Sequence, residues 1–383
     1  FVTIDPKTAK DFDDAVCLIE EEGKRTLWVA IADVAHYIEP ETLLDEEAKT
    51  RATSVYLPHA VLPMLPSRLS DNLCSLRAKV PRLAMTVSME IENDCTIGKV
   101  AAFESIIEVQ ENLSYEDALD NPKFQNMIDL AEELRRNEIR LNLNSAELRP
   151  RVHEDKITVN VKWPNKATEM IETFMVATNN SIGILLGEKN APLPWRCHAP
   201  PDAPEVEELN AKFKNMGINI ELPMPSVKKF GQSEEAELAS MLGDWANSGN
   251  IEISGLENSN DQDDVAQYLK NVLDPNARKD ILISLKEAQQ KANDLKSATR
   301  RVVDHGLFYL LQRAIYSPEN LGHFGLNLNA YVHFTSPIRR YADLVVHRQL
   351  KSFLNEEDWV HSEKEITEIS EQCTANSQEA KSI

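Results

Sequence analysis

Four aspartates lie within ten residues near the start of the chain. The segment Thr-Ile-Asp-Pro-Lys-Thr-Ala-Lys-Asp-Phe-Asp-Asp-Ala-Val places carboxylates at Asp5, Asp11, Asp13 and Asp14. Carboxylates this close repel one another unless some take up protons or cations bind among them. Hard oxygen ligands in this number suit Mg²⁺ or Mn²⁺, which prefer one or two carboxylates together with a substrate phosphate. The segment therefore predicts a divalent-metal site.

Two other interpretations of this segment compete with a metal site. An acidic, solvated turn is the commoner role of an Asp-x-Asp-Asp sequence, but the apolar neighbours Ile4, Phe12 and Val16 argue against full solvation. A calcium-binding loop is disfavoured, because no glycine stands at the sixth position and no glutamate closes the loop.

Two adjacent arginines form the second candidate site. They belong to the segment Tyr-Val-His-Phe-Thr-Ser-Pro-Ile-Arg-Arg-Tyr-Ala-Asp, which ends at Asp343. Ser336 followed by Pro337 is typical of a helix start, which would put Arg339 and Arg340 in the first turn, where the helix dipole disfavours cations. Guanidinium groups at such a position suit phosphate binding. The structural alternative is that Arg339 pairs with Asp343 one turn on and Arg340 lies on the surface.

The elements that must position these residues begin with β structure. Apolar or alternating runs joined by turn signals predict two strand pairs, Ala15–Glu20 with Thr26–Val34 and Leu83–Ile91 with Gly98–Val109. A short strand before Pro6 and the strand from Ala15 would gather the four aspartates at one end of this β structure.

Helices are expected through most of the remaining chain. Helical spacing and capping signals predict helices after Ser114, over Pro122–Leu141, over Ala167–Leu186, over Leu307–Tyr316 and from Pro337 to about Leu354. One more strand is predicted over Ile157–Val161. Residues 226–300 begin acidic and polar and become a charged helical stretch around Ala277–Ala298, which we interpret as a solvated insertion.

The size and composition indicate a globular protein. Of the 383 residues, 42% are hydrophobic, enough for a large buried core, and no apolar run is long enough to span a membrane. Length alone allows two or three domains, but no linker is evident, so we expect one large domain over residues 1–383. Five scattered cysteines disfavour a disulfide framework and a thiolate zinc site. They indicate a reducing compartment such as the cytoplasm.

The net charge argues against a nucleic-acid binder. There are 41 basic and 62 acidic residues, a net charge of −21, whereas nucleic-acid-binding domains are usually basic. Residues 231–264 carry nine acidic and no basic residues, and without them the charge is −12. Carboxylates that hold metal ions also add negative charge where RNA would bind, and the bound cations reverse its local sign. The charge therefore weakens an RNA-binding function without excluding it.

The two candidate segments and three further blocks resemble the catalytic (RNB) domain of the ribonuclease II/R family. The further blocks are Tyr-Leu-Pro…Pro-Met-Leu-Pro-Ser-Arg-Leu-Ser-Asp-Asn-Leu-Cys-Ser-Leu at 56–76, Met-Ile-Glu…Met…Ala…Asn at 170–179 and His-Phe-Gly-Leu at 323–326. All five occur in the family's order and cover nearly the whole chain. The Arg-Arg-Tyr-Ala-Asp form leans toward the ribonuclease R branch.

This resemblance implies a fold and a reaction. The fold would be a single α/β (α+β) domain, with mixed β-sheets and surrounding helices around a central RNA channel. The reaction would be 3′-to-5′ hydrolysis of single-stranded RNA, processively and to 5′-mononucleotides, with two Mg²⁺ ions or Mn²⁺. The implied partner is single-stranded RNA, with no membrane and a monomeric state. The resemblance also implies flanking OB-fold RNA-binding domains, which we expect in the full-length protein and not within these 383 residues. Because the chain begins at Phe1 and not at Met, we expect a longer protein, which leaves an organellar location open.

The resemblance also assigns roles at the metal site. Asp5, Asp11 and Asp14 match the family's metal ligands. Asp13 belongs to the same metal-binding group and matches the aspartate whose loss removes catalysis while RNA binding persists.

Four other residues receive roles around the RNA. Arg339 matches the arginine that stabilises the transition state, and Arg340 beside it is expected to bind RNA. Tyr56 matches the aromatic residue that stacks on the terminal nucleotide and sets the length of the final product. Glu172 matches a residue that contacts the 3′-terminal sugar.

The chain departs from the family pattern, and other functions compete. The stretch between His198 and His323 is longer than expected, and a further metal-site glutamate would lie beyond Ile383. One alternative is a catalytically weak or inactive family member that binds RNA as a regulator, although such a protein is expected to lose a site aspartate or the arginine. Another is a phosphohydrolase or DNA nuclease with the same two-metal chemistry. A third is a metal-binding module for protein contacts.

Overall fold

A four-stranded antiparallel sheet lies at the centre of the computed structural model, which describes residues 1–57, 60–139, 147–153, 156–201, 203–222, 275–311 and 313–382. Its strands follow the order β2 (Asp14–Glu21), β3 (Lys24–Ala32), β6 (Pro81–Ile91) and β7 (Ile97–Glu108). Both predicted strand pairs are confirmed. Strand β3 ends earlier than predicted, because Asp33 caps a short helical turn, η1 (Val34–His36).

A second, two-stranded sheet brings the start of the chain to this body. Strand β1 (Thr3–Asp5) pairs in parallel with β8 (Asn112–Ser114), so that Asp5 lies opposite Ser114. Helix α2 (Tyr115–Leu119) begins directly after β8 with the predicted capping box, in which the Ser114 and Asp117 side chains each bond the other's backbone N–H. The end of β1 is therefore held against a capped helix start.

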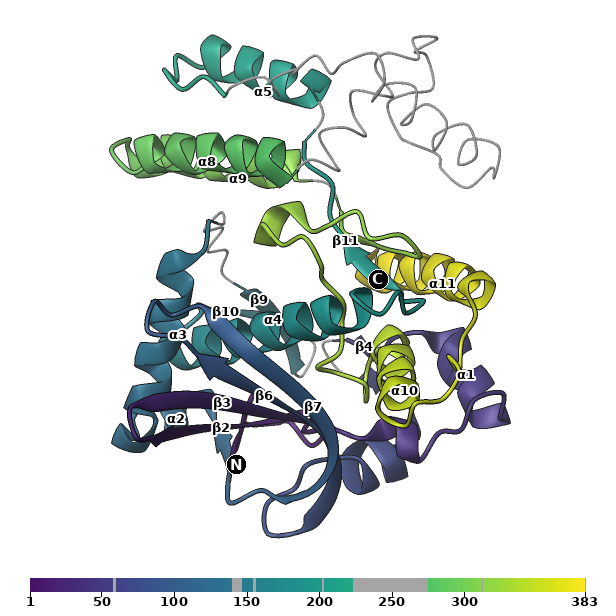
Figure 1. The fold of residues 1–383 in the computed structure, drawn as a ribbon. Helices are drawn as coiled ribbons and strands as arrows, with labels where there is room; N and C mark the ends of the chain where they lie inside the picture. The colour runs from purple at the N-terminus through teal and green to yellow at the C-terminus, as the bar shows by residue number, and fades with distance from the viewer. Residues whose placement is uncertain are drawn as a thin grey trace.

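Helices cover the sheet and form two adjoining cores. Helix α3 (Gln125–Asn137), preceded by η3 (Pro122–Phe124), and helix α4 (Lys166–Gly187) pack on one face. Leu130 of α3, Phe174 of α4 and Val87 of β6 belong to the same buried apolar cluster. A second core lies where α1 (Leu43–Arg51), α10 (Tyr341–Leu354) and α11 (Glu363–Ser382) meet, beside one end of the sheet (Figure 1). Helix α10 contributes apolar residues to both cores. Residues 140–141, at the end of the predicted helix Pro122–Leu141, lie outside the described residues.

Short strand pairs and turns complete the body. The strand predicted over Ile157–Val161 is confirmed within β10. The pairs are β4 (Val55–Tyr56) with β5 (Val61–Leu62), β9 (Glu147–His153) with β10 (Lys156–Lys162), and β11 (Trp195–Cys197) with β12 (Ile315–Ser317). The short helical turns η2 and η4 cover Leu69–Leu73 and Phe324–Leu326. The observed elements match the expected α/β class.

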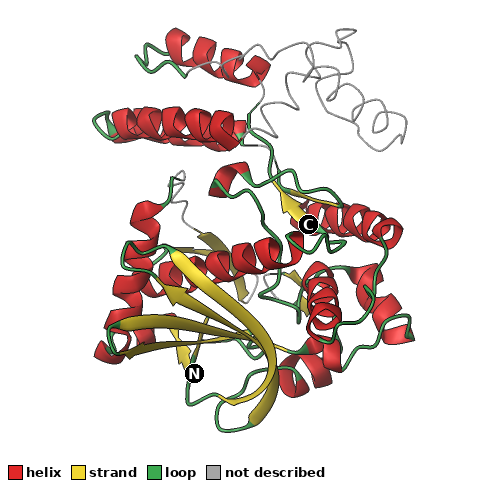
Figure 2. Cartoon of the chain, viewed as in Figure 1, coloured by secondary structure: helices red, strands yellow, loops and turns green. Residues whose placement is uncertain are grey.

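Three helices form a layer beside the body. Helices α5 (Ala203–Asn215), α8 (Pro275–Ala292) and α9 (Ser297–Leu310) lie side by side (Figure 1), and Figure 2 shows no strand in the described part of this layer. They enclose an apolar cluster that includes Phe213, Leu282 and Leu307. The prediction of a solvated segment is therefore wrong for 275–300, because one face of each helix there is buried. That residues 226–300 are an insertion stays a prediction. Residues 223–274 lie outside the described residues.

One arginine anchors this helical layer to the body. Arg278 of α8 is buried and donates to the backbone oxygen of Leu321 at 2.9 Å and to Oδ1 of Asn329 at 2.7 Å. The helix predicted over Leu307–Tyr316 is wrong beyond Leu310, because the chain there leaves α9 and extends into β12. None of the described helices has the length and apolar character needed to cross a membrane.

Candidate active site

Asp5 occupies the end of β1 with one carboxylate oxygen unsatisfied. Its Oδ2 atom is buried and accepts no hydrogen bond from the described residues. Burial, followed by the charges of Asp14 and Asp13, raises the pKa of Asp5 to about 8. A buried carboxylate oxygen without a donor is costly to leave charged, so this group favours a proton or a bound cation.

Asp13 connects the two segments that the sequence singled out. Its Oδ1 atom accepts a hydrogen bond from the backbone N–H of Ile338 at 2.9 Å, across 325 residues of sequence. Its Oδ2 atom lies 3.6 Å from Nε of Arg339. Asp13 is only 5% exposed, and burial raises its pKa well above the ordinary value, opposed by Arg339 and the Ile338 N–H. The structure thus brings the acidic segment and the arginine segment into direct contact.

Asp14 is the first residue of β2, next to Asp13, and interacts electrostatically with both arginines. Burial raises its pKa to about 6, while the positive charges of Arg339 and Arg340 act in the opposite direction. Three of the four predicted metal ligands, Asp5, Asp13 and Asp14, therefore lie close enough for their charges to interact, with Asp13 buried and the other two half-buried.

Asp11 lies on the loop between β1 and β2 and is held by a tyrosine. The hydroxyl of Tyr56 donates to Oδ2 of Asp11 at 3.0 Å. The loop backbone is fixed on both sides of Asp11, because Ser75 Oγ donates to the Lys10 oxygen at 2.7 Å and accepts from the Phe12 N–H at 3.1 Å. Burial, then the charge of Asp11, raises the pKa of Tyr56. The sequence had suggested no role for Ser75.

The sequence had predicted that the two arginines lie in the first turn of a helix. In the structure they precede helix α10 instead. The backbone N–H groups of Arg339 and Arg340 both bond the oxygen of Ser336, at 3.2 and 3.0 Å, in a turn. Arg340 is then extended, and α10 begins at Tyr341 and not at Pro337. The helix-dipole argument for these arginines is therefore wrong.

Arg340 is bound to an acidic residue of α10. Its Nε and Nη2 atoms each lie 2.7 Å from a carboxylate oxygen of Asp343, and the Ser336 N–H also donates to Asp343 at 2.7 Å. Asp343 is fully buried. The alternative in which Arg339 pairs with Asp343 is wrong, because Arg340 takes that position. Whether Arg340 also contacts RNA stays a prediction.

Arg339 points toward the aspartates and remains accessible. Its backbone oxygen accepts from Ser54 N–H at 3.0 Å and from Thr53 Oγ1 at 3.2 Å, which ties the turn to the strand leading to Tyr56. Its Nη2 donates to Ser336 Oγ at 3.0 Å. With a side chain 43% exposed, the guanidinium has donors left for an incoming anion.

Glu172 lies on a different element from the rest of the predicted site. It belongs to α4, with Oε2 4.0 Å from Nη1 of Arg135 on α3. The structure does not bring it into the aspartate group, and its role at a terminal sugar stays a prediction.

Two buried polar residues support the arginine segment and were assigned no role from sequence. Asn179 of α4 donates to the Tyr331 hydroxyl at 3.2 Å and accepts from the Phe334 N–H at 2.9 Å. The Nε2 atom of His347 lies 2.8 Å from the Phe334 oxygen, and the two rings stack at 4.2 Å. A polar residue inside an apolar helical face was the available signal for Asn179.

The carboxylates suit a hard cation that also keeps water or phosphate ligands. No three His, Cys, Asp or Glu side chains in the described part of the chain converge closely enough to hold an ion by themselves. Mg²⁺ binds through one or two carboxylates and completes its shell with water and phosphate oxygens. Such a cation would give the unsatisfied Oδ2 of Asp5 a partner. It would also stabilise the charged forms of Asp5 and Asp14, whose pKa values are raised without it.

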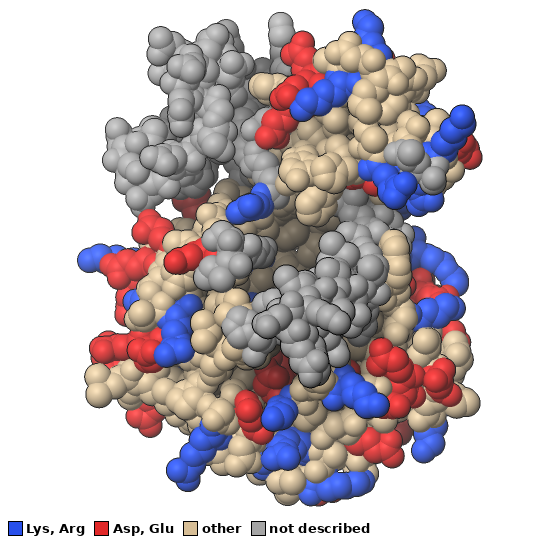
Figure 3. All heavy atoms as spheres, turned by 180° about the vertical axis from the view of Figure 1, so that it is seen from behind, with Lys and Arg blue, Asp and Glu red and all other residues tan. Residues whose placement is uncertain are grey.

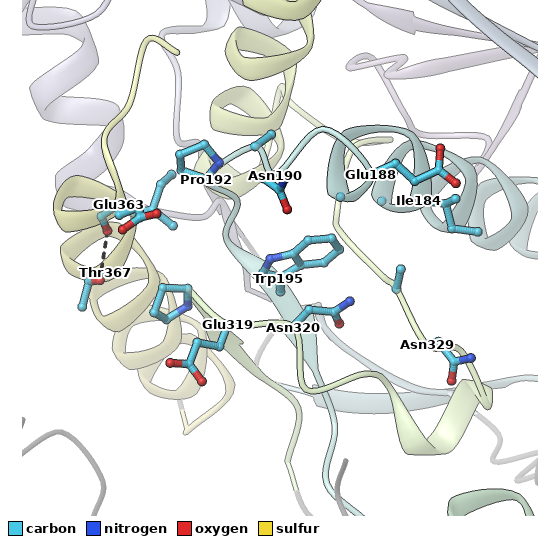
Figure 4. Close-up of a pocket in the computed structure, with 16 residues that line it drawn as sticks. Ile184, Glu188, Asn190, Pro192, Trp195, Glu319, Asn320, Asn329, Glu363 and Thr367 are labelled. Atoms are coloured by element: carbon cyan, nitrogen blue, oxygen red, sulfur yellow. Dashed lines mark hydrogen bonds between the residues drawn. The ribbon is translucent and has the colours of Figure 1, made fainter. Parts of the chain in front are cut away.

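A separate cavity of about 830 Å³ lies at the far end of α4, against α11 (Figure 4). The side chain of Trp195 lies between those of Asn190 and Asn320 in this cavity. None of the described residues that line it is Lys or Arg, and none belongs to the aspartate group. A phosphate chain would find no cationic partner there, so this cavity is not the counterpart of the aspartate–arginine site.

The described surface carries charges of both signs. On the face shown in Figure 3, Lys and Arg are interspersed with Asp and Glu, and no extended basic area is visible among the described residues. Attraction of a polyanion therefore depends on local features and not on this face as a whole.

Comparisons with known proteins identify the family and the fold of the chain. The family model described as the RNB domain matches residues 1–356. Ribonuclease R of Thermotoga maritima is 31% identical, over 97% of this chain and 48% of that protein. The chain spans about half the length of the curated relatives it matches.

Solved structures show the same fold. The apo form of Mycoplasma genitalium RNase R superposes with a TM-score of 0.78 at 25% identity, covering 100% of this chain and 55% of that one. The same protein has been solved in complex with ribose-methylated single-stranded RNA, with a TM-score of 0.76. Yeast Ssd1, described as a pseudonuclease, has a TM-score of 0.68 at 19% identity, covering 99% of this chain and 42% of that one, and shows the fold alone.

Proposed function

Because the chain belongs to the RNB domain family, we propose that it is the catalytic part of a 3′-to-5′ exoribonuclease acting on single-stranded RNA. The observation that carries the proposal is the contact between Asp13 and the Ile338–Arg339 turn. It sets a group of buried and half-buried carboxylates beside an accessible guanidinium, the pairing that a metal-assisted phosphodiester hydrolase needs.

The aspartates would provide the metal site. Asp5, Asp11, Asp13 and Asp14 would hold Mg²⁺ or Mn²⁺, which supplies a water of lowered pKa and neutralises charge on the phosphate and the leaving oxygen. Asp13 also bonds the Ile338 N–H and thereby keeps the arginine turn at the site. Asp13→Asn would remove the negative charge while keeping an oxygen that can accept the Ile338 N–H, so it should impair the metal site and leave the arginine turn in place.

The arginine and the tyrosine would handle the RNA. Arg339 donates hydrogen bonds to the phosphoryl oxygens as negative charge develops on them, in the manner of an oxyanion hole. The ring of Tyr56, with the residue 53% exposed, offers a surface on which the terminal base stacks, an interaction worth roughly 1–3 kcal/mol that needs no particular base. A channel that ends at this site would admit only a free 3′ end and release mononucleotides, and Glu172 would contact the terminal sugar.

The experiment is a degradation assay with single-stranded RNA and DNA. Both substrates carry a 5′ label and are incubated with Mg²⁺ and either the unaltered chain or Asp13→Asn. We expect a ladder of shrinking RNA, mononucleotide products, and loss of degradation with retained RNA binding in Asp13→Asn. The matched control is Asp280→Asn, an exposed aspartate of α8, which should leave the ladder unchanged. Equal activity on DNA, or internal cuts, would contradict the proposal.

A second candidate is a catalytically inactive RNA-binding regulator. Yeast Ssd1, described as a pseudonuclease, has a similar fold, so this fold also occurs in a protein without nuclease activity. The same assay separates the two functions, because a regulator binds the labelled RNA without shortening it at any Mg²⁺ concentration.

We also propose that the protein works in a reducing compartment such as the cytoplasm. All five cysteines are free, and Cys74, Cys197 and Cys373 are buried. Burial raises the pKa of each of these three thiols to about 12, so they stay protonated and unreactive.

A further inference from the structure

Tyr56 links the two halves of the candidate site. Its hydroxyl donates to Asp11 Oδ2 at 3.0 Å. Two residues earlier, the Ser54 N–H bonds the Arg339 oxygen at 3.0 Å, and Thr53 forms a backbone bridge with Arg340. Strand β4 therefore runs from the arginine turn to the loop that carries Asp11.

The carboxylate of Asp11 is oriented mainly by this tyrosine. Ser75 fixes the backbone on either side of Asp11 but does not hold its side chain. Within the described part of the chain, the bond from Tyr56 is the one hydrogen bond that the Asp11 carboxylate accepts. Without it, the carboxylate would be free to rotate on a loop that has no regular secondary structure.

The strand that carries this hydroxyl is also bonded to the remainder of the site. The Ser54 N–H and Thr53 Oγ1 both donate to the Arg339 oxygen, at 3.0 and 3.2 Å, and the Nε atom of Arg339 lies 3.6 Å from Oδ2 of Asp13. The hydrogen bond from Tyr56 therefore connects the Asp11 carboxylate to the segment that carries Arg339. The second oxygen of Asp11 remains available to a cation.

We propose that the Tyr56 hydroxyl is a positioning group for Asp11 as a divalent-metal ligand, separate from the role of the Tyr56 ring as a stacking surface. This inference rests on the proposed function, because it takes Asp11 as one of the metal ligands. Hydrogen bonds to ligating groups orient them before the metal arrives, and their loss typically weakens metal binding 10- to 100-fold.

The substitution Tyr56→Phe separates the two roles. It keeps the ring, and it removes only the hydroxyl of a residue that is 53% exposed, so no buried cavity results. Titration of the RNA-free protein with Mn²⁺, followed by the electron paramagnetic resonance signal of free Mn²⁺, measures affinity without any turnover. We expect Mn²⁺ to bind roughly 10- to 100-fold more weakly to Tyr56→Phe.

The matched control is Tyr309→Phe, which removes the hydroxyl of a tyrosine that is 70% exposed on α9. Its Mn²⁺ affinity should equal that of the unaltered protein. Equal or tighter Mn²⁺ binding by Tyr56→Phe would overturn the proposal.

A double-mutant cycle tests whether Tyr56 acts through Asp11. In an Asp11→Ala background the hydroxyl has no carboxylate to orient, so adding Tyr56→Phe should not weaken Mn²⁺ binding further. The same loss in both backgrounds would mean that the hydroxyl acts elsewhere, and the proposal would fail.

The outcomes also separate this inference from the proposed function. Mn²⁺ binding that depends on Tyr56, in a protein that does not shorten RNA, contradicts the ribonuclease function and supports the positioning role. If the protein degrades RNA but its Mn²⁺ affinity does not depend on the Tyr56 hydroxyl, the ribonuclease function is supported and the positioning role is contradicted.

Discussion

The Nε atom of Arg339 lies 3.6 Å from Oδ2 of Asp13, and the two side chains differ greatly in exposure, 43% for the arginine and 6% for the aspartate. The aspartate is fixed by burial and by its bond from the Ile338 N–H. The arginine keeps one side open to solvent. An incoming anion can therefore reach the guanidinium of Arg339 but not the buried carboxylate of Asp13.

Removing the guanidinium should slow the reaction more than it weakens RNA binding. For Arg339→Ala we expect kcat to fall about 10²- to 10³-fold, the usual loss for one donor to a developing oxyanion. The Kd for single-stranded RNA should change little, because other contacts hold the chain. Single-turnover rates and binding isotherms separate the two effects.

Arg301→Ala is a suitable control for this substitution, since Arg301 is exposed on α9 outside the aspartate group. An unchanged kcat in Arg339→Ala, with a loss confined to RNA affinity, would show that Arg339 binds RNA without stabilising the transition state.

The raised pKa of Asp5 predicts how the stability of the metal-free protein depends on pH. Folding raises the pKa of Asp5 from 3.8 to about 8, so the folded state binds this proton more tightly than the unfolded state. The contribution of Asp5 to stability is therefore complete below about pH 3.8 and is lost as the pH rises through about 8. Asp5→Asn removes this titration. The Tm of the variant minus that of the unaltered protein should therefore increase as the pH rises.

Thermal unfolding of both proteins in chelator, at several pH values between about 5 and 8.5, measures that difference. Mg²⁺ should raise the Tm of the unaltered protein most at the higher pH values, where it replaces the lost protons, and should raise that of Asp5→Asn less. A Tm difference that does not vary with pH would argue against a buried, cation-seeking carboxylate at this position.

Arg340 should matter for stability whether or not it touches RNA. Replacing it by Met leaves the fully buried Asp343 without its guanidinium partner, and breaking such a pair typically costs about 3–5 kcal/mol. Denaturant unfolding of Arg340→Met measures this loss. Arg51→Met, which breaks an exposed pair with Glu47, should cost under about 1 kcal/mol. Similar losses in both variants would contradict a buried structural role for Arg340.

The strands and the capped helix start could be predicted from sequence because their signals are local. The pairs β2–β3 and β6–β7 are joined by short turns and have apolar residues on the buried face, so neighbouring residues determine the pairing. The capping box at Ser114 likewise involves residues only three apart. The proximity of Asp13 to Arg339 came from family resemblance, since no local pattern relates positions so distant.

The start of α10 could not be predicted, because long-range contacts override its local signals. Ser336 and Pro337 have the features of a helix start, yet the Asp343 carboxylate takes the Ser336 N–H and the Arg340 side chain. Backbone pairing of Arg340 with Thr53 then holds it extended. Because α10 starts at Tyr341 and not at Pro337, Arg339 faces the aspartates and Arg340 does not. The hydrogen bond from Tyr56 to Asp11 could not be predicted from the sequence either.

The proposed activity requires that the four aspartates hold divalent cations beside Arg339. Anomalous scattering from crystals soaked in Mn²⁺ tests this requirement most directly. We expect one or two Mn²⁺ peaks about 2.0–2.2 Å from carboxylate oxygens of the group formed by Asp5, Asp11, Asp13 and Asp14. Crystals that show no peak there at millimolar Mn²⁺, or show ordered Mn²⁺ only elsewhere, would contradict it.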